Sequence, residues 1–117
     1  MSNRASRVQN LYSALEQRVL VLDGAMGSPL LERNLKPEDY GGDKFEGCNE
    51  YLNFTRPDVV IEILEDYLKA GCDIIETNTF GGTPIVLDEF SLGSKAYDIN
   101  KKAAELASGL AAKYNTP

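Results

Sequence analysis

Two apolar runs mark the chain, and each ends in polar residues. The first, Val19–Leu22, contains only valine and leucine and stops at Asp23. The second, Asp73–Phe80, begins with two isoleucines after its first residue and becomes polar toward its end. Continuous apolar runs bounded by turn residues are typical of strands buried on both faces, as in a parallel sheet. The pattern therefore predicts two buried parallel strands.

Helical spacing of apolar residues predicts a helix between the two strands. A short helix is expected from Ser28 to Arg33, and residues 41–53 are expected to form an ordered loop. The helix that follows has Thr55 as its predicted N-cap and Gly71 as its C-terminal stop. Its apolar face is expected to comprise Val60, Ile63, Leu64, Tyr67 and Leu68.

Three more helices are predicted toward the two ends of the chain. After the second strand, a short helix is expected from Pro84, capped by Thr83, and a longer one from about Lys95 to Lys113. The apolar stripe of the longer helix is Ala96, Ile99, Ala103, Leu106, Ala107 and Leu110. An N-terminal helix is indicated by Val8, Leu11, Tyr12 and Leu15, which recur at helical spacing.

This order of elements predicts an α/β fold. Strand, crossover helix, strand and helix are the units of a parallel sheet whose faces are covered by helices. A closed (β/α)8 TIM barrel takes about 250 residues, so 117 residues predict its first two β/α units, incomplete as given. The domain prediction is an N-terminal part of a barrel domain over residues 1–117. Within it, residues 1–18 are a helical extension and residues 19–117 are barrel units one and two.

The composition of the chain argues against several classes of partner and of catalytic site. The net charge is −6, with 18 acidic against 12 basic residues, which argues against nucleic acid or an anionic membrane as the partner. No apolar run approaches the roughly 20 residues that span a bilayer, so a cytoplasmic protein is expected. The absence of histidine excludes Ser-His and Cys-His nucleophile systems within this chain. Cys48 and Cys72 are expected to be free thiols without a catalytic or metal-binding role.

The first polar cluster follows the first strand directly. Asp23 is succeeded by Gly24, Ala25, Met26 and Gly27, a glycine-bracketed turn that lets main-chain N–H groups approach a bound carboxylate. Ligands of parallel α/β proteins bind beyond the carboxyl ends of the strands, where this turn is expected. A plain turn, in which Asp23 bonds only to the local backbone, is an equally open interpretation.

The second polar cluster ends the second strand. Alternation along a strand places Glu76 and Asn78 on one face and Thr77 and Thr79 on the other. A carboxylate there suits a substrate ammonium group, and amide or hydroxyl groups can orient a small polar ligand. The alternative is a polar layer that only fills the barrel interior.

In the preceding loop, Tyr51, Asn53 and Phe54 are candidates for a lid, although aromatic residues in loops are more often structural anchors.

Three blocks of the sequence carry a family resemblance. They are Val19–Gly27, then Cys48–Asn53 with Arg56–Val60, and then Ala70–Gly81. Their order and spacing resemble the start of a homocysteine S-methyltransferase domain. Their residues are most similar to those of the cobalamin-dependent methionine synthase branch of this family. The resemblance covers nearly the whole chain from about Val19 onward.

The resemblance implies a (β/α)8 barrel that transfers a methyl group to homocysteine to form methionine. In this family, zinc held by three cysteine thiolates binds the homocysteine sulfur as a thiolate, which supplies a nucleophile without a histidine base. It also implies which residues bind the amino-acid portion of homocysteine. These are Asp23, Gly24, Ala25 and Met26 in the turn, and Glu76, Thr77, Asn78 and Thr79 at the strand end.

The chain departs from the family pattern in its metal ligands. The zinc cysteines of the family lie on later barrel strands, and Cys48 and Cys72 do not match them. No catalytic residue and no metal ligand is therefore expected in this segment. Zinc and methylcobalamin are implied for the parent enzyme, with their ligands outside the segment, and the isolated chain is expected to be inactive.

Two further interpretations stay open. The chain is alternatively a non-catalytic binding or self-association module, whose open sheet edge pairs with the remainder of the barrel or with a second chain. A third interpretation is a different barrel enzyme that uses Asp23 and Glu76 as an acid/base pair.

Overall fold

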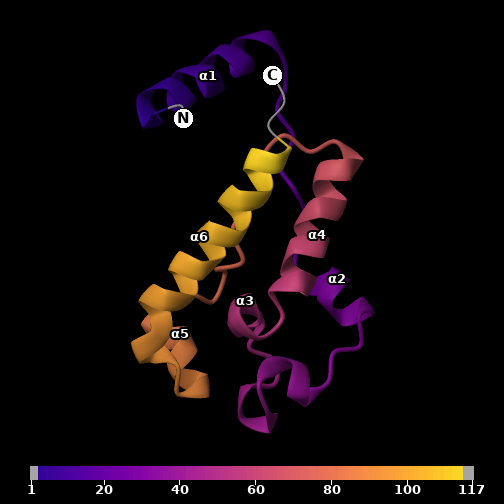
Figure 1. Cartoon of the computed structure of the whole chain (residues 1–117), viewed down its shortest axis with the longest axis vertical. Coiled ribbons are helices and arrows are strands. Elements are labelled where there is room, and N and C mark those ends of the chain that lie inside the picture. Colours follow the sequence, from indigo (N-terminus) through magenta and orange to yellow (C-terminus); the bar gives the residue numbers. More distant parts are fainter. Residues whose placement is uncertain (1–2, 115–117) are drawn as a thin grey trace.

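Helices dominate the structure, a computed structural model that describes residues 3–114 (Figure 1). The α-helices are α1 (Arg4–Gln17), α2 (Gly27–Glu32), α3 (Leu52–Thr55), α4 (Pro57–Ala70), α5 (Pro84–Leu87) and α6 (Ala96–Lys113). Five short 3-10 turns are η1 (Pro37–Tyr40), η2 (Asp43–Phe45), η3 (Asn49–Tyr51), η4 (Asp88–Phe90) and η5 (Gly93–Lys95). The outer residues of the predicted domain range, 1–2 and 115–117, lie outside the described part.

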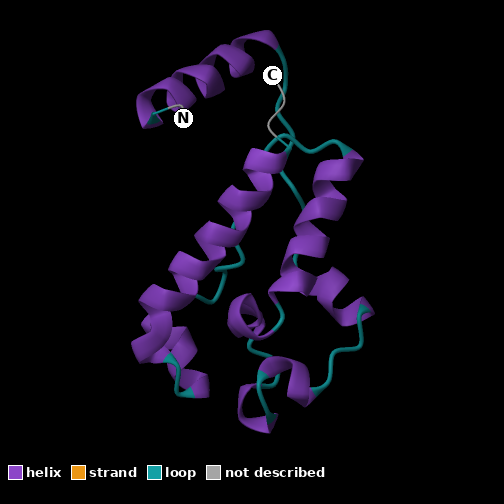
Figure 2. Ribbon diagram, viewed as in Figure 1, coloured by secondary structure: helices purple, strands orange, loops and turns teal. Residues whose placement is uncertain are grey.

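The prediction of barrel β/α units is wrong for this structure. Figure 2 shows helices and loops, and no strand is formed within residues 3–114. The two predicted strands do run side by side, but they share only an isolated parallel bridge between Leu22 and Ile74. A buried parallel strand needs hydrogen-bonded neighbours and covered faces. Within residues 3–114 the two segments have only each other as hydrogen-bonded backbone neighbours. Their faces are also uncovered, since Val19, Val21 and Leu22 are 84%, 55% and 57% exposed.

Helix α4 forms where its sequence predicts it, with one change at its start. Pro57 occupies the first turn, and Gly71 ends the helix in a left-handed conformation with φ of 107°. The predicted cap, Thr55, is wrong, because Thr55 is the last residue of α3 and its hydroxyl donates to the carbonyl oxygen of Tyr51 in η3. Arg56 takes the N-cap position without a side-chain cap hydrogen bond.

The main apolar core lies between α4 and α6, the two long helices that contact each other (Figure 1). Its buried residues are Leu30, Tyr40, Leu52, Val59, Val60, Ile63, Leu64, Ala107 and Leu110. The predicted stripe of α6 is confirmed, since five of its six residues are buried and Leu106 is half-buried. A second cluster of Cys48, Leu87, Leu92, Ala96 and Ile99 joins α5 and the start of α6 to the loop before α3. The predicted Thr83 cap of α5 is also confirmed, because its side chain accepts from the N–H of Val86.

Helix α1 is present as predicted, but it buries none of its residues. Directly after it, the guanidinium of Arg18 lies 2.9 Å from the Asp73 carboxylate. The second oxygen of that carboxylate accepts from the N–H of Val21.

No helix of the described residues is long and apolar enough to cross a membrane.

We expect the α4 core to set the stability of the chain. Replacing Leu64, which is 1% exposed, in the variant Leu64→Ala should lower the free energy of unfolding by about 2–5 kcal/mol, because a cavity remains. The matched control is Leu31→Ala on α2, where the side chain is 80% exposed and the change should stay within about 0.5 kcal/mol. Urea denaturation of both variants measures this, and equal losses would contradict the assigned core.

The Asp39 carboxylate should make stability depend on pH on the acid side. Its pKa is lowered because it accepts from the Lys36 N–H and pairs with the Arg56 guanidinium. A lowered pKa in the folded state gives stability that is present near neutral pH and lost as Asp39 becomes protonated below about pH 4. Asp39→Asn should therefore be less stable than the unmodified chain at pH 7, and the two should converge in acid. The control Glu38→Gln replaces an exposed carboxylate and should change the free energy of unfolding at pH 7 by less than about 0.5 kcal/mol.

Candidate functional site

The polar ends of the two predicted strands meet in the structure. Beside the bridge of Leu22 and Ile74, the N–H of Asp23 donates to the Ile74 carbonyl oxygen across 2.9 Å. Asp23 Oδ2 in turn accepts from the N–H of Glu76, with 3.0 Å between the atoms. The turn after the first segment is therefore adjacent to the polar end of the second.

The other carboxylate oxygen of Asp23 has no partner. Oδ1 is buried and accepts no hydrogen bond from the described residues. An unsatisfied buried polar group costs about 1–3 kcal/mol, and more when it is charged, so such an atom in a folded protein needs an explanation. A ligand ammonium group would supply donors and the opposite charge to this oxygen.

The turn after Asp23 offers main-chain donors. Gly24 and Ala25 are exposed, and the Met26 side chain packs against the main apolar core. The N–H groups of these three residues have no acceptor within the described part of the chain. The turn can therefore contact a ligand through its backbone, while the Met26 side chain anchors it to the core.

The second polar cluster separates into accessible and buried residues. Glu76 and Thr77 are exposed, and Thr79 is half-buried. The hydroxyl oxygens of Thr77 and Thr79 lie 2.7 Å apart and share a hydrogen bond. Asn78, between them, is only 5% exposed. Thr77, Thr79 and the Glu76 carboxylate are thus the side chains of this cluster that a ligand can reach.

Asn78 is engaged with a second buried asparagine, Asn53. The Asn78 amide nitrogen donates to the Asn49 carbonyl oxygen at 2.9 Å and to Asn53 Oδ1 at 3.1 Å. Asn53 donates in return to the main-chain oxygens of Asn78 at 3.1 Å and Ile99 at 3.5 Å. The lid prediction is wrong for Asn53, which is fully buried. These mutual bonds tie the polar segment to α3 and α6 and use both amide hydrogens of Asn78.

Glu50 was not identified from the sequence as part of this region. Its carboxylate Oε2 accepts from the N–H of Gly81 at 3.1 Å, directly after the polar segment. Gly81 is buried, and a Cβ placed there would stand 3.1 Å from both the other Glu50 oxygen and Val86 Cγ1. The glycine pair at 81–82 was the available signal for this close approach.

Neither cysteine is activated as a nucleophile or as a metal ligand. Both are free, as predicted. Burial raises the pKa of the Cys48 thiol. Burial also raises the pKa of the Cys72 thiol, and the carboxylates of Asp23 and Asp73 raise it further. Since the thiolate is the nucleophile and the metal ligand, raised pKa values disfavour both roles.

The described residues do not fit a zinc site. Within residues 3–114, no group of three or more His, Cys, Asp or Glu side chains could hold a metal ion. A zinc site needs such a set of converging ligands. The polar cluster at Asp23 and Glu76 instead offers carboxylate and hydroxyl groups that can bond to a small polar ligand.

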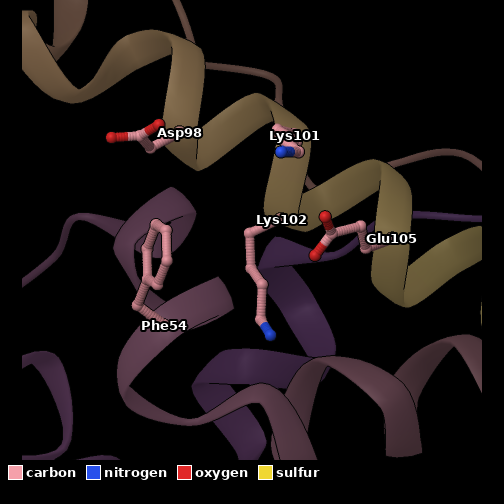
Figure 3. A pocket seen from close by; sticks show the side chains of 5 residues that line it. All are labelled: Phe54, Asp98, Lys101, Lys102 and Glu105. Atoms are coloured by element: carbon pink, nitrogen blue, oxygen red, sulfur yellow. The ribbon is translucent and has the colours of Figure 1, made fainter.

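A separate groove lies between α3 and α6 (Figure 3). It holds about 210 Å³ and is lined by Phe54, Asp98, Lys101, Lys102 and Glu105. It contains none of the eight predicted site residues. Its two ammonium and two carboxylate groups balance in charge, and it is open to solvent, so we assign no ligand to it.

Comparison with known proteins agrees with the resemblance. The sequence profile described as homocysteine S-methyltransferase matches residues 20–117. The chain is 42% identical over 108 residues to the methionine synthase of Mycobacterium leprae and 41% identical over 108 residues to that of Mycobacterium tuberculosis. Each match covers 92% of this chain but only 9% of the relative, so the chain spans about a tenth of their length. The chain belongs to the homocysteine S-methyltransferase family.

Proposed function

We propose that this chain supplies the amino-acid-binding part of a methyltransferase of the methionine synthase type, with homocysteine as its ligand. The observation that carries the proposal is the buried Oδ1 of Asp23, which has no hydrogen-bond partner among the described residues. Homocysteine presents an ammonium group, which is both a hydrogen-bond donor and a positive charge. Family membership and the two methionine synthase relatives support this choice over other amines.

Each end of the amino-acid portion has a complementary group in this arrangement. The Glu76 N–H fixes one oxygen of the Asp23 carboxylate, which leaves Oδ1 to accept from the ligand ammonium. The N–H groups of Gly24, Ala25 and Met26, which have no acceptor among residues 3–114, are donors for the ligand carboxylate. Glu76, Thr77 and Thr79 add polar side chains on the second segment, while Asn78 holds that segment in place.

Zinc and methylcobalamin belong to the proposed parent enzyme. Zinc, when bound, would hold the homocysteine sulfur as a thiolate and so supply the nucleophile. The described residues do not fit the metal, so this chain's own contribution is to bind and orient the amino-acid end. Methyl transfer to give methionine is the activity of the parent.

Asp23→Asn should weaken homocysteine binding in a full-length hybrid. In this hybrid, the chain replaces the matched 108-residue segment of the M. tuberculosis methionine synthase. Loss of a charged hydrogen bond should lower the affinity by at least about tenfold, as measured by calorimetric titration in the presence of zinc.

The matched control for this titration is Asp98→Asn. Asp98 is an exposed carboxylate on α6 that lines the separate groove, so this change should leave the affinity unaltered. An unchanged affinity in Asp23→Asn, or equal losses in both variants, would refute the assignment of Asp23.

The purified 117-residue chain should not transfer methyl groups. Supplied with zinc, methylcobalamin and homocysteine, it should form no methionine above the level without protein, because its described residues provide no metal site. Methionine analysis by mass spectrometry measures this, with the intact hybrid as the active control. Sustained turnover by the chain alone would overturn this part of the proposal.

A further inference from the structure

Tyr67, on α4, supports the turn that follows Asp23. Its hydroxyl donates to the carbonyl oxygen of Ala25, with 2.5 Å between the two oxygens. Its ring lies against Gly24 so closely that a Cβ there would stand 2.8 Å from the hydroxyl oxygen and 2.9 Å from a ring carbon. The φ angle of Gly24 is not in the left-handed region. A side chain at Gly24 would therefore require the tyrosine ring to shift from its present place.

The hydroxyl contact also fixes the direction of a main-chain donor. The C=O and N–H of a trans peptide point in opposite directions, and the described residues contain no cis peptide bond. Since the Ala25 carbonyl points at Tyr67, the N–H of Met26 in the same peptide unit points away from it. That N–H has no acceptor within the described residues.

We infer that Tyr67 is a positioning residue for the carboxylate of an α-amino-acid ligand. By holding the Ala25 carbonyl, it turns the Met26 N–H toward the side on which the ligand binds, without touching the ligand itself. Gly24 and Tyr67 form a complementary pair, since a side chain on Gly24 would push the ring away and release the carbonyl. The inference rests on the proposed function, because it requires an amino acid at the Asp23 turn.

Tyr67→Phe in the full-length hybrid tests this role. The variant keeps the ring and removes the hydroxyl, and one lost hydrogen bond should weaken homocysteine binding about two- to tenfold. The discriminating probe is 3-aminopropane-1-thiol, which has the thiol and ammonium of homocysteine but no carboxylate. Its affinity should stay unchanged in Tyr67→Phe. Equal weakening of both ligands, or weakening of neither, would overturn the inference.

A second variant tests the contact between Gly24 and Tyr67 by changing Gly24. Gly24→Ala retains the hydroxyl but crowds the ring, and it should also weaken homocysteine more than 3-aminopropane-1-thiol. Gly109→Ala is its control, because no atom lies within 4 Å of the added Cβ there. Tyr97→Phe, at a 77% exposed tyrosine of α6, is the control for hydroxyl removal. Both controls should bind the two ligands normally, and a selective loss in either would contradict the role given to Tyr67.

Failure of the proposed function gives a different result. Asp23→Asn should weaken both ligands, because both present an ammonium group to Oδ1. If Asp23→Asn weakens neither, the homocysteine assignment of this turn is wrong. If it weakens both while Tyr67→Phe spares both, only the positioning role is wrong.

Discussion

The hydrogen bond from the Glu76 N–H to the Asp23 carboxylate is the contact on which the candidate site depends. It joins residues 53 positions apart and lies beside the isolated parallel bridge of Leu22 and Ile74. It also gives the two carboxylate oxygens different roles. Oδ2 fixes the orientation of the side chain, whereas Oδ1 is buried without a hydrogen-bond partner in the described part of the chain. Together with the bond from the Asp23 N–H to the Ile74 carbonyl oxygen, this contact places the turn and the polar segment next to each other, so that one ligand can contact both.

Side chains of the helices bond to both the turn after Asp23 and the polar segment 76–79. Tyr67 of α4 supports the turn at Ala25, whereas Asn53 of α3 locks Asn78 of the polar segment. The interlocked amides also reach α6 through the Ile99 carbonyl. Buried polar groups that satisfy one another in this way favour a single arrangement of the elements they join. The site is thus positioned by side-chain contacts from helices, with very little sheet pairing.

The helices could be predicted from the sequence, whereas the two predicted strands are not formed within residues 3–114. The apolar faces of α4 and α6, the Gly71 stop and the Thr83 cap depend on residues within one turn of each other, which a pattern records directly. Strand formation depends on partners far away in the chain, and the described residues bring together only two short segments. The position after apolar runs marks the two polar clusters as candidate sites, and the family resemblance implies that their eight residues bind the amino-acid portion of homocysteine. The burial of Asn53 was missed because it arises from tertiary contacts that no local spacing reveals.

A crystal structure of the full-length hybrid with homocysteine would test the central claim most directly. The account predicts that the ligand nitrogen lies within hydrogen-bond distance of Asp23 Oδ1 and that the ligand carboxylate faces the N–H groups of the 24–26 turn. Homocysteine bound with Asp23 Oδ1 still unpaired, or seated in the groove of Phe54 and Lys102, would contradict it.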